Sequence, residues 1–115
     1  MASITKEFLT GSTNGRPIKV VATATAGTTL HTAPAGTTSK DEVTIYFSNT
    51  DTVERAVTVE FGGVTAPDDH MRFLVPPGES ILGIPGIPIN NSLVVKAFAA
   101  AANVVTAWGY VNRIS

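Results

Sequence analysis

The stretch Val43-Thr-Ile-Tyr-Phe-Ser48 decides the fold of this chain. Every second residue in it is large and apolar, and a period of two is typical of a β-strand that turns one face toward a core. The same alternation resumes over residues 56–61, after the turn-forming residues 49–52. Two antiparallel strands joined by a tight turn explain both runs.

Further strand patterns lie on both sides of this pair. The run over residues 81–89 contains two prolines and two glycines, which suits an edge strand or a crossing between sheets. Turn formers separate the runs, and no helical period is sustained. Strands are predicted over residues 71–75, 93–99 and 104–111, and residues 18–25 and 27–32 are predicted to form two strands or one strand with a bend. The sequence therefore predicts an all-β fold: a single antiparallel β-sandwich or jelly-roll-like domain of seven to eight short strands.

The N-terminal residues differ from the rest of the chain. Residues 1–15 close on Thr10-Gly-Ser-Thr-Asn-Gly15, a cluster of turn formers that does not sustain a long regular element. We predict a flexible N-terminal arm over residues 1–15 and a sandwich domain over residues 16–115. Ile4, Phe8 and Leu9 are apolar, so the arm either folds back on its own core or docks on a neighbouring subunit.

Composition limits the partners. A chain of 115 residues fits one domain with one core. Charged residues make up 15% and the net charge is -1, which offers no field to attract a phosphate backbone and argues against nucleic acid as a partner. Lys96 and Asn103 interrupt the longest apolar run, which argues against a membrane span. The first residues lack the pattern of a secretory signal, so synthesis and folding in a cytoplasm are expected.

Residues for catalysis are not grouped in the sequence. No cysteine is present, which excludes disulfides, thiolate metal sites and cysteine nucleophiles. The two histidines, His31 and His70, lie in separate segments. His31 is predicted on a strand surface, Asp68-Asp69-His70 in a solvated loop, and Glu60 on an outward position that aids solubility. We predict no catalytic residue, metal ligand or cofactor.

Aromatic residues leave two alternatives open. Trp108, Tyr110, Tyr46 and Phe98 would form a platform for sugar rings if their faces were exposed together. The other interpretation places Trp108 and Tyr110 on one strand face, in the core or at a subunit contact. We favour the second interpretation.

The order of several segments resembles a known group of proteins. The segments are Leu30-His-Thr-Ala-Pro-Ala-Gly-Thr-Thr38, Val43 to Thr50, Val57-Thr-Val-Glu-Phe-Gly-Gly63, Val75-Pro-Pro-Gly-Glu-Ser80 and the closing residues 93–114. In this order they resemble small β-sandwich virion proteins of tailed phages. The resemblance covers about residues 28 to 114.

The resemblance implies a capsid decoration, or cement, protein. Such a protein would be made in the host cytoplasm and would bind the major capsid protein on the outer surface of the virion, as a homo-oligomer with a trimer favoured. The alternatives are a small tail or fibre module, or a carbohydrate-binding β-sandwich that uses Trp108 and Tyr110. The residues expected at the capsid or subunit interface are Ile4, Phe8, Leu9, Arg72, Trp108, Tyr110 and Arg113.

Overall fold

A computed structural model describes residues 3–115, and it contains strands, turns and loops with no helix. The described chain holds nine strands. They are β1 (Ile4–Phe8), β2 (Ile18–Lys19), β3 (Thr28–Thr32), β4 (Lys40–Asn49), β5 (Arg55–Phe61), β6 (His70–Val75), β7 (Ser80–Ile89), β8 (Val94–Ala99) and β9 (Val105–Ile114). Within the described residues, no helix could cross a membrane.

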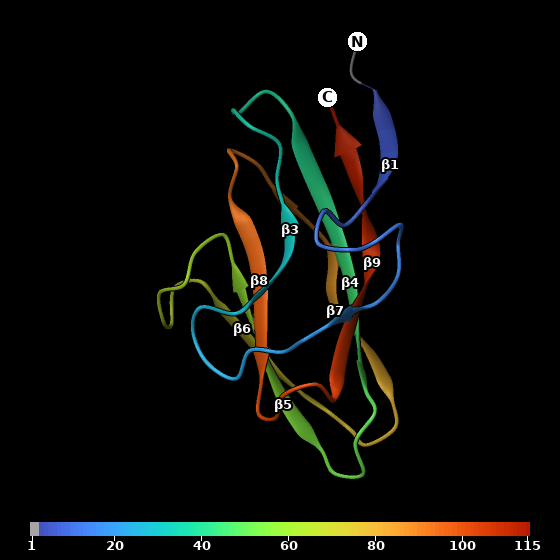
Figure 1. The fold of residues 1–115 in the computed structure, drawn as a ribbon. Coiled ribbons are helices and arrows are strands. Elements are labelled where there is room, and N and C mark those ends of the chain that lie inside the picture. The colour runs from blue at the N-terminus through green and yellow to red at the C-terminus, as the bar shows by residue number, and fades with distance from the viewer. Residues whose placement is uncertain (1–2) are drawn as a thin grey trace.

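The strands form two antiparallel sheets that face each other (Figure 1). Sheet A has the order β1-β9-β4-β7, with β2 also paired to β9, and sheet B has the order β3-β8-β5-β6. If β1 and β2 are counted as one interrupted strand, this is the strand order of an eight-stranded jelly roll. The predicted β-sandwich or jelly-roll-like fold is therefore confirmed.

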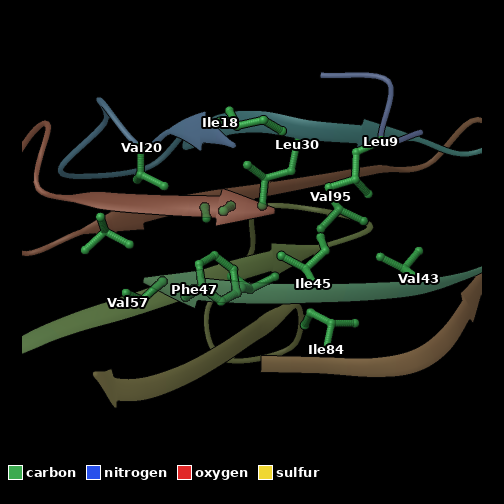
Figure 2. Close-up of a cluster of buried hydrophobic side chains, with 14 of the residues drawn as sticks. Leu9, Ile18, Val20, Leu30, Val43, Ile45, Phe47, Val57, Ile84 and Val95 are labelled. Carbon is green, nitrogen blue, oxygen red and sulfur yellow. The ribbon is translucent and has the colours of Figure 1, made fainter. Parts of the chain in front are cut away.

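The core lies between the sheets and follows the alternation of β4. Val43, Ile45 and Phe47 are completely buried, while Thr44, Tyr46 and Ser48 between them are only partly covered. Side chains from both sheets meet around Phe47, as Figure 2 shows. The Phe47 ring also packs against Phe73 of β6, with ring centroids 5.5 Å apart. The apolar period of two thus forms a two-layer core.

The N-terminal residues are part of the sandwich. Residues 4–8 form β1 and pair with Tyr110–Ile114 of β9, so the first described residues lie beside the C-terminus (Figure 1). Leu9 follows β1 and is 1% exposed, within the core cluster drawn in Figure 2. Of the apolar residues in the predicted arm, Leu9 folds back on the core, whereas Ile4 and Phe8 stay exposed on β1. Met1 and Ala2 of the predicted arm lie outside the described residues.

Two segments differ in detail from the predicted strands. The expected strand over residues 18–25 is limited to β2, and the chain leaves sheet A after residue 20 to run across the outside of sheet B. β7 is the edge strand that its prolines predicted, and its register with β4 shifts twice. Prolines and bulges at an edge hinder pairing with further strands.

Candidate docking face on sheet A

The outer face of sheet A carries a group of aromatic and apolar side chains that we call the aromatic face. Strand register brings its residues together, because directly opposed residues in antiparallel strands share one face. Tyr46 lies opposite both Trp108 and Leu82, and Tyr110 lies opposite Phe8. The aromatic face consists of Phe8, Tyr46, Leu82, Trp108 and Tyr110.

Tyr46 and Trp108 form the centre of the aromatic face. Their rings stack with centroids 4.4 Å apart and planes 10° apart. The indole Nε1 of Trp108 donates a hydrogen bond of 2.8 Å to the Ser48 hydroxyl, which is 2.6 Å from the Ser80 hydroxyl. One face of each ring and the indole N–H are thus already used within the molecule.

The two sides of this stack are less covered. Leu82 on β7 is 48% exposed and Phe8 on β1 is 63% exposed. The ammonium group of Lys6 lies 4.5 Å from the centroid of the Tyr110 ring, within the range of a cation–π interaction. A hollow of about 420 Å³ opens beside Phe8 and Tyr110, with Gly15 and Gly109 in its lining. The aromatic face therefore combines an ordered centre with exposed apolar flanks.

The residues expected at an interface divide into two groups. Phe8, Trp108 and Tyr110 lie together on the aromatic face, and Ile4 projects from the same side of β1 with 70% exposure. Leu9, Arg72 and Arg113 do not join them.

These three residues lie away from the aromatic face for different reasons. The expectation that Leu9 contacts a partner is wrong for this fold, because its side chain fills the core between the sheets. Arg72 is exposed, but it lies on β6 of sheet B. The guanidinium of Arg113 binds the Asp41 carboxylate, with Nε to Oδ1 at 2.8 Å and Nη2 to Oδ2 at 3.1 Å. Phe98, the fourth candidate for a sugar platform, is on β8 of sheet B and packs edge-on against His70.

Arg113 belongs to a polar cluster with the buried residues His31 and Asp41. His31 Nε2 is 2.6 Å from Asp41 Oδ2, and His31 Nδ1 accepts a hydrogen bond of 3.1 Å from the Thr10 backbone N–H. The ring is therefore neutral with its proton on Nε2, which donates to Asp41. The expected surface position of His31 is wrong, because its side chain is completely buried. Both ring nitrogens are therefore hydrogen-bonded within the molecule.

The charges in this cluster are mutually stabilised. Burial lowers the pKa of His31 below 6.5, and this outweighs the opposing effect of Asp41. Burial alone would raise the pKa of Asp41, but hydrogen bonds from Arg113 and His31 hold it below its usual value. The hydrogen bond to Asp41 raises the pKa of Arg113. An ionised carboxylate, a guanidinium and a neutral imidazole result.

A second buried carboxylate belongs to Glu60 on β5. Glu60 was expected to be outward and solvated: its side chain does point out of sheet B, but the expected solvation is wrong, because the side chain is completely buried. Its two oxygens accept hydrogen bonds from the Thr25 hydroxyl at 2.8 Å and the Gly27 N–H at 2.7 Å. His70 Nε2 lies 3.6 Å from Glu60 Oε2. Glu60 therefore holds the segment around Thr25 and Gly27 against the outside of sheet B.

Among residues 3–115 no three His, Asp or Glu side chains are grouped so that they could hold a metal ion. Comparisons of the chain with protein-family models, with curated proteins and with solved structures found no match.

Proposed function

We propose that this chain is a structural protein that docks on other protein through the aromatic face, as a capsid decoration, or cement, protein on the outside of a tailed-phage head. The observation that carries the proposal is the exposure of Phe8 and Leu82 beside the Tyr46–Trp108 stack. Exposed apolar groups of this kind mark interaction sites, and aromatic side chains are enriched among residues that dominate binding energy.

The composition of the chain supports the same proposal. Only 15% of its residues are charged, so contacts with a partner would depend on shape and apolar burial more than on charge pairs. In a cementing role, a rigid sandwich bridges neighbouring capsid subunits, and each subunit must lose contacts with two partners before the shell opens. A trimer would add effective concentration for its second and third sites, so each contact needs little affinity. Jelly rolls also occur in capsid and lectin domains, which is an analogy of fold alone.

The carbohydrate-binding alternative requires open ring faces. A sugar platform presents aromatic faces to the apolar side of a sugar ring, whereas Tyr46 and Trp108 cover one face of each other. The Trp108 N–H is also bonded to Ser48 and is not available to a sugar hydroxyl. These contacts favour protein over carbohydrate as the partner of the aromatic face.

Location in the particle tests the proposal. We expect electron cryo-microscopy of the phage that encodes this chain to place its density on the outer surface of the head, with sheet A toward the capsid protein. Density at the tail or fibre would support the alternative module. Absence from the purified particle would contradict a virion role of any kind.

Fluorescence gives a second test in solution. Trp108 is the single tryptophan of the chain, so its emission reports on the aromatic face alone. We expect the emission to shift when empty heads of the same phage are added and to stay unchanged across a panel of glycans. A response to glycans without one to heads would favour the carbohydrate-binding module.

A matched substitution separates docking from folding. Because Leu9 belongs to the core, deletion of residues 1–15 would disturb the fold, whereas Phe8→Ser alters an exposed side chain. We expect Phe8→Ser to weaken binding to heads by about 1 to 2 kcal/mol, roughly five- to thirtyfold in Kd. Arg72→Ala on sheet B is the control and should bind as the unchanged chain does. Equal binding of both variants would remove Phe8 from the docking face.

A further inference from the structure

The residues just after β1 are fastened to β3 across the open side of the sandwich. Gly11 N–H donates to the Leu30 carbonyl at 2.9 Å, and Thr32 N–H donates to the Thr10 hydroxyl at 2.7 Å. A side chain at residue 11 would collide with the backbone oxygens of Thr29 and Leu30, so glycine permits this close approach. We call residues 9–11 the N-terminal latch.

The third contact of the latch is made to a titratable side chain. Thr10 N–H donates to Nδ1 of His31 at 3.1 Å, while Nε2 of the same ring is bonded to Asp41. A proton taken from solvent at Nδ1 turns that nitrogen from an acceptor into a donor. The resulting imidazolium would then point an N–H group at the N–H group of Thr10. The latch contact is therefore compatible only with the neutral ring.

The charged groups around the ring are few. The Asp41 carboxylate of β4 contacts Nε2 directly, and Arg113 of β9 binds that carboxylate. The Glu7 carboxylate of β1 attracts the Arg113 guanidinium electrostatically. On the β8 side, the residue opposite His31 is the apolar Val95. The Arg113 guanidinium already neutralises the Asp41 carboxylate. A protonated His31 would therefore add a positive charge that no further carboxylate in the cluster offsets.

We propose that His31 is an acid-sensitive switch that releases the N-terminal latch from β3 while the rest of the sandwich stays folded. β1 keeps its own five paired residues on β9, and of the latch residues only Leu9 belongs to the core cluster. Release would uncover the outer backbone groups of β3 and the Leu9 side chain. This inference does not rest on the docking role, and its test involves no partner.

The direction of the pH effect follows from linkage. His31 holds its proton less tightly in the closed latch than in the open one, because the pKa of the buried ring lies below its ordinary value of 6.5. Closing of the latch is then most favourable at a pH above 6.5, and it becomes less favourable as the pH falls toward the pKa of the buried ring. Within this window the closing constant falls about tenfold per pH unit.

Amide hydrogen exchange of the unchanged protein tests the switch. We expect the protection of the Gly11 and Thr32 amides to be constant above about pH 6.5 and to fall about tenfold per pH unit below it. The Val20 amide, bonded to the Val105 carbonyl of β9 at 2.9 Å, is the reference and should keep its protection. Constant protection at Gly11 and Thr32 would overturn the proposal. A parallel loss at Val20 would overturn it too, since that would indicate global unfolding.

Two histidine variants sharpen the test, because the chain has only His31 and His70. His31→Asn places an amide oxygen near the position of Nδ1 and cannot be protonated, so its latch should show no pH dependence. His70→Gln is the matched control and should keep the full pH dependence. Retention of the pH dependence in His31→Asn would contradict the switch. If that variant does not fold, the exchange data on the unchanged protein decide the question.

Discussion

The outer faces of the two sheets differ in how far other segments of the chain cover them. On sheet A, Tyr46 and Trp108 point outward and stay at the surface, with Leu82 beside them. On sheet B, Glu60 also points outward, yet it is completely buried because the segment around Thr25 and Gly27 runs over it. The chain thus covers sheet B around Glu60 and leaves the aromatic face of sheet A uncovered.

A single close approach allows this cover. A side chain at residue 27 would collide with the backbone of Ala97 on β8, so glycine lets the segment lie directly on sheet B. The Glu60 carboxylate then binds the Gly27 N–H from below. An outward strand position is therefore a candidate docking site only where no other segment of the same chain lies on it.

The largest expected loss of stability tests the assignment of inward and outward residues in β4. Phe47→Ala removes a completely buried ring, so we expect unfolding in urea to become easier by about 3 to 5 kcal/mol. Tyr46→Ala on the next position of β4 is the control and should cost about 1 kcal/mol through loss of the stack. If both variants lost the same stability, the assignment of inner and outer sides in β4 would be wrong.

A smaller loss of stability is expected when the contacts between Glu60 and the segment over sheet B are removed. Glu60→Ala leaves the Gly27 N–H and the Thr25 hydroxyl without their acceptor, and we expect a loss of about 2 kcal/mol in the free energy of unfolding. Glu54→Ala in the exposed turn before β5 should change stability by less than about 0.5 kcal/mol. A loss no greater for Glu60 than for Glu54 would mean that packing alone holds the segment.

The alternation of β4 and the turn residues sufficed to predict the two-layer fold. The same alternation, extended backward by one step, places Asp41 in the inward phase of Val43, and Arg113 shares the inward phase of Val111 on β9. That signal was present in the sequence. What the sequence did not disclose was His31 as their partner, because β3 belongs to the other sheet and meets them only after both sheets pack.

The aromatic face was predictable in part for the same reason. Trp108 and Tyr110 share a side of β9 by simple alternation, and Tyr46 follows from β4. Leu82 was missed because two register shifts in β7 hide its phase. The burial of Glu60 and Leu9 depends on loops that cross from one sheet to the other, and local patterns carry no information on such long-range contacts.

The most direct measurement compares two leucines on opposite sheets. Leu82 of the aromatic face and Leu74 of sheet B are 48% and 49% exposed, and both point outward from edge strands. Binding of Leu82→Ser and Leu74→Ser to empty heads therefore differs only in the face that is altered. We predict that Leu82→Ser weakens binding by about 1 kcal/mol, or roughly fivefold in Kd, while Leu74→Ser binds normally. Weaker binding of Leu74→Ser with normal binding of Leu82→Ser would contradict the account and move the docking site to sheet B.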